Sequence, residues 1–144
     1  MKRDINHALG YHINVVSHFI HNKYNEKLAE YGLTSAQAKV MYFLGGYGEQ
    51  IQSELQQRLY IKGSSMNGLV ETLYKKDLIV KRVCESDRRV KLISLTDKGK
   101  ALEGKLWDVL EELEVQLVDG FNKEERQVMI SWLKRMKENI QSCH

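Results

Sequence analysis

Residues 51–96 constrain the fold more than any other part of the chain, because their pattern predicts two short helices followed by two strands. The first helix, about residues 51–59, has apolar residues four positions apart, which form one buried stripe: Ile51, Leu55 and Leu59. Residues 60–63 interrupt that pattern, and Gly63 tolerates the backbone angles of a sharp turn. We therefore expect a helix-turn-helix in this region.

The helix after this turn has one apolar face and one small, polar face. Ser64 or Ser65 is expected to cap its first turn by accepting a backbone N–H. The apolar residues are Met66, Leu69, Val70 and Leu73. The opposite face carries Ser64, Ser65, Asn67, Gly68, Glu71, Thr72 and Lys75. Small, hydrogen-bonding side chains let a helix enter the major groove of DNA and contact base edges, so this face is a predicted DNA-reading surface.

Two short strands with a basic loop between them are predicted after these helices. Residues 78–83 and 90–95 are rich in Val, Ile and Leu, with polar residues between them. The loop that joins them ends in Arg88 and Arg89, which a hairpin tip would present to phosphates or to a minor groove. Asp87 is expected to pair with one of these arginines and to fix its direction.

Several longer stretches then occur in a characteristic order: LTSAQAKVMYFL, SSMNGLVETLYKKDLI, Asp87-Arg88-Arg89 and LISLTDKGK. In this order and spacing the chain resembles the multiple antibiotic resistance regulator (MarR) family of bacterial transcription factors over nearly its whole length. The resemblance implies a mainly α fold with a small β-wing in a single domain. Residues 33–100 would form the winged helix-turn-helix, and residues 1–32 and 101–144 would form a helical dimerisation region.

We predict that double-stranded DNA is bound by the polar helix face and the wing together. On the helix and in the turn before it, the candidates are Lys62, Ser64, Ser65, Asn67, Gly68, Glu71, Thr72 and Lys75. In the wing they are Arg88, Arg89 and Lys91, with Asp87 orienting an arginine. Either serine has a plainer alternative role as a helix cap alone.

The charge distribution favours contact with nucleic acid. Residues 33–100 contain 12 Lys and Arg against 7 Asp and Glu, while the whole chain has a net charge of +3. Positive charge therefore gathers on the segment that carries the DNA candidates, as expected of a phosphate-binding surface. A solvated surface with a chance asymmetry of charge explains the same numbers.

The flanking helices predict a homodimer. A helix over about residues 5–31 ends at Gly32 and has an apolar stripe at Leu9, Ile13, Val16, Ile20, Tyr24 and Leu28. A helix over about residues 97–119 follows the wing, is capped by Thr96 and ends at Gly120. The last helix would bury Val128, Met129, Trp132, Leu133, Met136 and Ile140. One compact module cannot cover all these stripes, so we expect two chains to interlock and bind a pseudo-palindromic operator with half-site centres about 10 base pairs apart.

Capping boxes mark the start of two helices. Thr34 with Gln37 opens a helix that buries Ala38, Val40, Met41 and Leu44 and is expected to end at Gly45-Gly46. Asn122 with Glu125 opens the final helix in the same way.

The family resemblance implies a small aromatic or anionic effector that binds between the dimerisation helices and the winged module. The candidates near that region are Tyr11, His12, His18, Met41, Tyr42 and Tyr47, and each is alternatively a plain core or surface residue. A metal site is suggested by four histidines on the first helix: His7, His12, His18 and His21. However, no cysteine or carboxylate cluster accompanies them. We therefore predict no metal and no cofactor; the alternatives for these histidines are the lining of an effector pocket and a zinc site completed by another helix.

Composition limits the remaining classes. A chain of 144 residues is one domain by length, and no apolar run approaches the ~20 residues that span a bilayer, so we expect a cytoplasmic protein without membrane contact. No nucleophile elbow or glycine-rich phosphate loop is present, so we predict no enzymatic activity.

Cys84 near the wing either responds to oxidation or is a structural thiol. The rival function is a winged-helix adaptor that binds proteins without DNA; the basic wing speaks against it.

Overall fold

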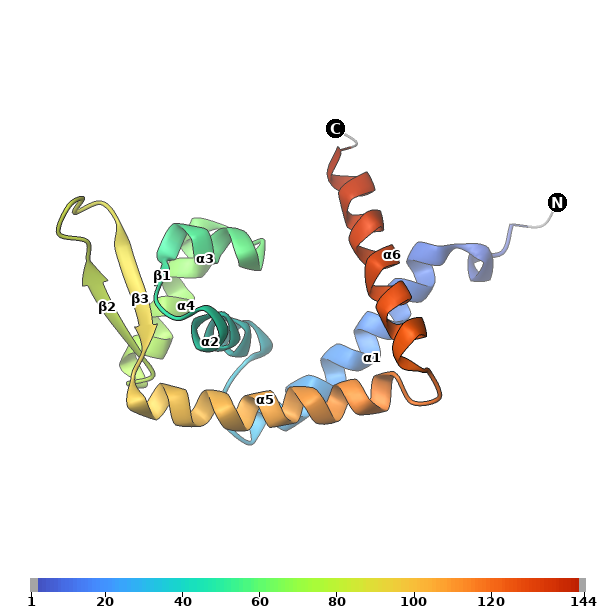
Figure 1. The fold of residues 1–144 in the computed structure, drawn as a ribbon, viewed down its shortest axis with the longest axis horizontal. Helices are drawn as coiled ribbons and strands as arrows, with labels where there is room; N and C mark the ends of the chain where they lie inside the picture. Colours follow the sequence, from blue (N-terminus) through green and yellow to red (C-terminus); the bar gives the residue numbers. More distant parts are fainter. Residues whose placement is uncertain (1–2, 143–144) are drawn as a thin grey trace. The chain divides into compact units, whose positions relative to one another are not determined.

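The computed structural model describes residues 3–142, in which six α-helices accompany one small sheet (Figure 1). The chain divides between Leu110 and Glu111 into two compact units, and each is described by itself. This agrees with the mainly α class and the β-wing predicted from the sequence.

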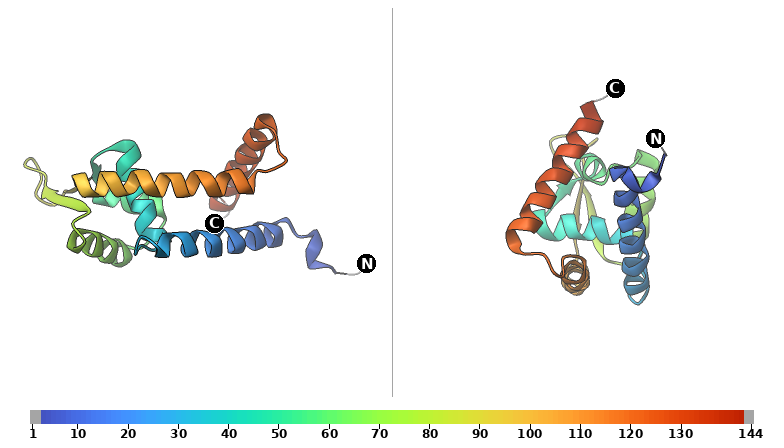
Figure 2. Two further views of the ribbon diagram at one scale, coloured as in Figure 1. Left: turned by 90° about the horizontal axis from the view of Figure 1, so that it is seen from below. Right: turned by 90° about the vertical axis from the view of Figure 1, so that its right-hand side faces the viewer.

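The first unit is a winged helix-turn-helix preceded by a long helix. A short 3-10 helix (Ile5–His7) comes before α1 (Leu9–Ala29), α2 (Ser35–Tyr47), β1 (Gln50–Ile51), α3 (Gln52–Leu59), α4 (Gly63–Lys75), β2 (Ile79–Val83), β3 (Lys91–Leu95) and the first part of α5 (Asp97–Leu117). The sheet has the order β1-β3-β2, and both pairings are antiparallel. Ile93 in the central strand faces Gln50 on one side and Lys81 on the other. The tip of the β2–β3 hairpin projects beyond α3 and α4, as Figure 1 and the left view of Figure 2 show.

The core of this unit lies where α2, α3, α4 and the sheet meet. Its fully buried side chains come from every one of these elements: Val40, Met41, Leu55, Met66, Leu73, Ile79 and Ile93. Most of the apolar residues predicted for the 33–44 and 64–76 helices are therefore buried as expected; Leu69 is only half-buried. Burial of such side chains contributes about 1.5–3 kcal/mol each, which fixes α4 firmly against its neighbours.

The turn between α3 and α4 differs from the prediction. Tyr60, and not Gly63, has the positive φ of 56°, and its N–H closes the end of α3 on the carbonyl of Gln57 at 3.2 Å. Gly63 is already the first residue of α4, and Lys62 occupies the N-cap position without a side-chain cap. The predicted caps by Ser64 and Ser65 are therefore wrong, because both serines lie inside the helix. Both residues remain on its exposed face.

Helix α2 continues through Gly45-Gly46 and ends only after Tyr47, at Gly48 with φ 76°. The predicted end at the glycine pair is wrong, since a glycine weakens a helix by about 1 kcal/mol and tertiary packing easily offsets that. A Cβ at Gly45 would meet the side chain of Glu103, so the glycine permits close packing of α2 against α5. Strand β1, two residues long, was not predicted, because a sequence pattern needs more residues to show alternation.

The predicted polar caps are confirmed elsewhere. Thr34 Oγ1 accepts from the Gln37 N–H at 3.2 Å, and Gln37 Oε1 accepts from the Thr34 N–H at 3.0 Å. Thr96 Oγ1 accepts from the Gly99 N–H at 2.9 Å and starts α5. Gly32 and Gly120 both have positive φ at the predicted helix ends.

The second unit contains the end of α5 and helix α6 (Lys123–Ser142). The Asn122–Glu125 capping box forms with N–H···O distances of 2.9 and 2.8 Å. No described residue of α6 is buried in the single chain, and Trp132, Leu133 and Ile140 are 51%, 50% and 76% exposed. The stripe predicted to be buried is therefore exposed in one chain alone. Helix α1 in the first unit behaves similarly, since Tyr24 and Leu28 are its buried residues and Leu9 and Val16 remain exposed.

Two tyrosine hydroxyls tie α1 to α2 and α5. Tyr42 Oη donates to the Leu106 carbonyl at 2.9 Å, and the Tyr24 hydroxyl is hydrogen-bonded to Tyr42. The Tyr42 ring also meets the Trp107 ring edge-on at 5.7 Å between centroids. Burial raises the pKa of both phenols above the ordinary value of about 10, and the hydrogen bond to Tyr42 raises the pKa of Tyr24 further.

A raised pKa in the folded state predicts loss of stability in alkali. The protonated phenols contribute their full stabilisation below pH 10, and that contribution is lost as the pH rises from 10 towards the raised values. In urea titrations we expect Tyr42→Phe to lower stability at pH 8 and to reduce the further fall seen above pH 10. The surface variant Tyr47→Phe is the control and should follow the wild type; a Tyr42→Phe profile parallel to wild type would contradict the assignment.

Candidate nucleic-acid interface

The exposed face of α4 presents the residues predicted to meet DNA. Met66, Val70 and Leu73 anchor the helix from below in the core. On the outer face the structure exposes Lys62, Ser64, Ser65, Asn67, Gly68, Glu71 and Lys75 and half-buries Thr72. Their shared exposure makes them available to a ligand as large as a duplex.

Three of these side chains are engaged within the protein, and one of them is Asn67, whose Oδ1 accepts from Gln52 Nε2 at 2.8 Å. Thr72 Oγ1 donates to the Gly68 carbonyl one turn earlier, at 2.9 Å, which occupies its hydroxyl hydrogen. Glu71 forms an ion pair with Lys81 of β2 at 3.3 Å, and the Lys81 ammonium also lies 4.2 Å from the Tyr74 ring centroid. The pairing of Glu71 reduces its repulsion of DNA phosphates. Lys81 was missed in the sequence, because it meets Glu71 only when β2 folds back on α4.

A groove of about 350 Å³ runs between α4 and the wing strands. Its walls come from α3, α4, β2 and β3, and its lining residues are Gln52, Asn67, Val70, Glu71, Lys81, Arg82, Val83 and Lys91. It joins Asn67 and Glu71 of the predicted helix face to Lys91 of the predicted wing set. Gln52 also belongs to this surface, although it is not part of the predicted site.

Arg82 is held by an acid from outside the hairpin. Its Nε and Nη2 donate to the two carboxylate oxygens of Glu49 at 2.9 and 2.7 Å. The arginine hydrogen bonds hold the pKa of Glu49 below its usual value. This bidentate pair ties the residue before β1 to β2 and so orients the wing relative to α3.

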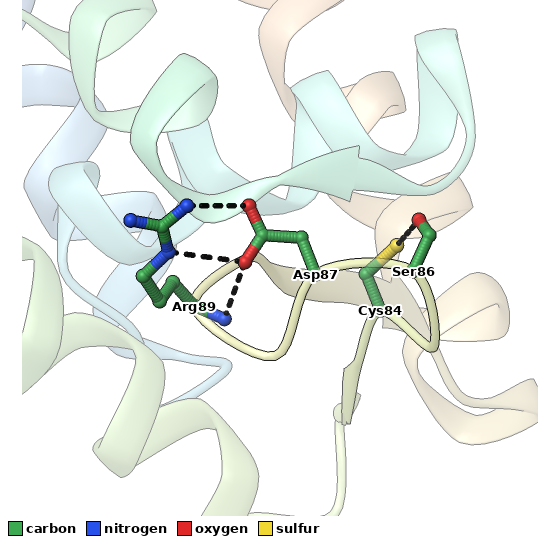
Figure 3. A network of polar contacts seen from close by, with 4 residues as sticks. All are labelled: Cys84, Ser86, Asp87 and Arg89. Carbon is green, nitrogen blue, oxygen red and sulfur yellow. Dashed lines mark hydrogen bonds and ion pairs between the residues drawn. The ribbon is translucent and has the colours of Figure 1, made fainter.

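The tip of the wing is built around Asp87 (Figure 3). The Asp87 carboxylate accepts from the Arg89 backbone N–H at 3.0 Å and from Arg89 Nε and Nη2 at 3.2 and 3.4 Å. These contacts hold the pKa of Asp87 below its usual value. The predicted pairing of Asp87 with one arginine is confirmed, and the partner is Arg89. Arg88 is exposed and forms no ion pair within residues 3–142.

Cys84 lies at the base of the same loop and is half-buried. Its Sγ is 3.2 Å from the Ser86 hydroxyl (Figure 3), and that hydrogen bond lowers the pKa of the thiol. The structure thus places the thiol in the wing loop that also carries the predicted DNA-binding arginines.

The effector candidates lie in different surroundings. His12 and His18 are exposed on α1, where their Nε2 atoms contact the Asn6 carbonyl at 2.7 Å and Asn22 Nδ2 at 3.2 Å. Tyr11 is also exposed, whereas Met41 is a fully buried core residue. Tyr42 belongs to the hydroxyl pair described above. Tyr47 is exposed, and the Cζ atom of Arg58 lies over its ring, 4.5 Å from the ring centroid.

The part of the chain that the structure describes brings no three His, Cys, Asp or Glu side chains into a metal-binding group. Among its helices, none combines the length and the apolar character needed to cross a membrane.

The fold and this surface define a winged helix-turn-helix protein, and the comparisons with known proteins agree. The model of the MarR family matches residues 31–90. The HTH-type transcriptional regulator YwaE of Bacillus subtilis (strain 168), itself uncharacterised, is 25% identical over 115 residues, which are 80% of this chain and 67% of YwaE. These matches agree with the resemblance to the MarR family of transcription regulators that the sequence motifs predicted.

Solved structures show the same similarity. The S. aureus MepR–DNA complex superimposes with a TM-score of 0.83 at 27% identity, covering 92% of this chain and 98% of the MepR chain. MepR in its DNA-binding conformation gives a TM-score of 0.85 at 26% identity, with 91% and 97% coverage. A mutant of E. coli MarR complexed with operator DNA, at 22% identity and a TM-score of 0.82 over 94% and 99% of the chains, shares the fold.

Proposed function

We propose that this chain is a dimeric, sequence-specific DNA-binding repressor that a small aromatic or anionic effector releases from its operator. The observation that carries the proposal is the joint surface of α4 and the wing, where exposed polar residues of a firmly anchored helix adjoin exposed basic side chains. MepR, which was crystallised with DNA, supports the DNA part because it shares both fold and sequence with this chain. Such a regulator acts on chromosomal DNA in the cytoplasm.

The roles within the surface follow from its chemistry. Asn67 and the serines of α4 would contact base edges, since they carry short hydrogen-bonding groups on the exposed helix face. Lys62, Lys75, Lys91 and Arg88 would contact phosphates or a minor groove, because their charges are not used in ion pairs within residues 3–142. Glu71 would act through Lys81 and would not read a base itself.

Operator selection followed by a salt titration tests DNA binding. We expect purified protein to select a pseudo-palindrome from random duplexes and to lose affinity steeply as salt rises. If each of the four unpaired cations contacts one phosphate in each subunit, log K against log salt should have a slope of about −7, because counterions are released on binding. A flat salt response without sequence selection would instead favour a protein-binding adaptor and overturn the proposal.

The dimer is proposed from the apolar face of α6. Its stripe at Val128, Met129, Trp132, Leu133, Met136 and Ile140 has no buried member, and an apolar surface of this kind is covered when two chains associate. In analytical ultracentrifugation we expect Leu133→Lys to raise the dimer dissociation constant about 100-fold or more, since each dimer loses two buried leucines. Gln127→Lys adds the same charge on the opposite face of α6 and should leave the dimer intact. A Leu133→Lys dimer as tight as wild type would refute this interface.

The effector part of the proposal rests on the family resemblance. A ligand that binds one spacing of the two α4 helices better than another would shift the population away from the DNA-competent state. A thermal-shift screen of phenolic and benzoate compounds, followed by operator-release measurements with each hit, tests it. Hits that stabilise the protein without releasing the operator would contradict the release mechanism.

A further inference from the structure

A hydrogen bond between two side-chain amides links α3 to the exposed face of α4. Gln52, the first residue of α3, donates from Nε2 to Oδ1 of Asn67 at 2.8 Å. Both side chains line the groove beside the wing, and Asn67 is exposed. Leu55 and Met66, both fully buried, anchor the two helices close to this contact. The amide pair is therefore carried by two well-fixed backbones.

Pairing two amides leaves the amino group of one and the carbonyl oxygen of the other outside the pair. The Oδ1 atom of Asn67 is engaged, so its Nδ2 group remains available to donate. The Nε2 atom of Gln52 is engaged, so its Oε1 remains available to accept. With both amides turned over, the pair would still present one group of each kind. The charged neighbours Glu71 and Arg82 do not compete, because they are paired with Lys81 and Glu49.

We infer that the Gln52–Asn67 pair recognises an adenine in the major groove. This inference rests on the DNA binding proposed above. Asn67 donates to adenine N7, and Gln52 accepts from the adenine N6 amino group. Guanine presents two acceptors at the same edge, so its O6 would face the Gln52 carbonyl oxygen and be rejected. Gln52 thus determines specificity from outside α4.

The test uses the operator selected by the wild-type protein and its single-base substitutions. We expect an A·T pair at one position of each half-site, with at least a roughly 10-fold loss of affinity when it is replaced by G·C. Gln52→Ala and Asn67→Ala should each relax the preference at that same position. The double variant should lose less than the sum of the single losses, because the two amides act as one unit.

A variant whose side chain only accepts hydrogen bonds gives a sharper test of base preference. In Gln52→Glu the new carboxylate only accepts, so Asn67 turns its amino group towards it and presents Oδ1 outward. The preference should then move towards cytosine, whose N4 group donates. Gln57→Ala, another exposed α3 amide that does not line the groove, is the matched control and should keep the adenine preference. Unchanged thermal unfolding of each variant checks the fold.

The outcomes separate this inference from the proposed function. A wild-type protein that selects no DNA sequence overturns the proposed function and this inference with it. A wild-type protein that selects an operator, while Gln52→Ala keeps every base preference, overturns the inference alone. Relaxed preference at one shared position in both single variants, absent from Gln57→Ala, supports it.

Discussion

Gly99→Ala is expected to destabilise the first unit by about 1–3 kcal/mol, the usual cost of forcing extra atoms into a packed site. A Cβ at Gly99 would overlap the carbonyl oxygen of Leu78 and crowd the Leu95 side chain at 3.3 Å. That carbonyl accepts from the Thr96 N–H at 3.1 Å, so the start of α5 and the start of β2 would have to separate. Urea denaturation should show a lower midpoint with an unchanged slope.

Gly104→Ala is the matched control for that experiment. Gly104 lies in the same helix, but nothing is within 4 Å of a Cβ built there. Alanine is the better helix former, so this variant should be as stable as wild type or up to about 1 kcal/mol more stable. Equal stability of Gly99→Ala and Gly104→Ala would show that the contact between α5 and Leu78 is not tight.

The double substitution Arg88→Ala with Arg89→Ala should weaken operator binding about 100-fold or more with little effect on folding. Both arginines are exposed in the wing. A charged hydrogen bond contributes about 1.5–3 kcal/mol to binding, and a dimer would lose at least one such bond in each of its two subunits. Arg88→Ala alone should account for much of the loss, because Arg88 is unpaired within residues 3–142, whereas Arg89 is already held by Asp87. Electrophoretic or fluorescence titration at fixed salt measures the effect.

Lys134→Ala removes a positive charge from the polar face of α6 and controls for net charge. It should leave operator affinity nearly unchanged at physiological salt, where distant exposed charges are screened. If the wing variants bind as tightly as Lys134→Ala, the wing has no part in DNA binding and α4 alone carries the affinity.

Features that depend on residues close together in the sequence were predicted correctly, whereas features that depend on packing against distant elements were not. The capping box at Thr34–Gln37 and the buried stripe of α4 were predicted correctly, because both depend on residues three or four positions apart. The end of α2 was predicted too early, since Gly45 packs beside Glu103 of α5. Packing against distant elements outweighed the low helix propensity of two glycines.

The candidate site shows the same division. The sequence identified the exposed face of α4 and the basic wing, and it anticipated the Asp87 pair, because Asp87 and Arg89 are near neighbours in one loop. It missed Gln52, Glu49 and Lys81, whose partners lie 15, 33 and 10 residues away along the chain. Nothing in the local pattern around these residues indicates where such partners fall.

The amino-acid sequence therefore predicted the helices, the wing, the resemblance to the MarR family and the polar and basic side chains of the surface, since periodicity and capping are local properties of a chain. The tertiary structure was needed to show which of those side chains are already engaged. It showed Glu71 held by Lys81, Arg82 held by Glu49 and the Asn67 amide held by Gln52. Those pairings depend on how α3, α4 and β2 cross, and the crossing is set by burial of the shared core rather than by any single stretch of sequence.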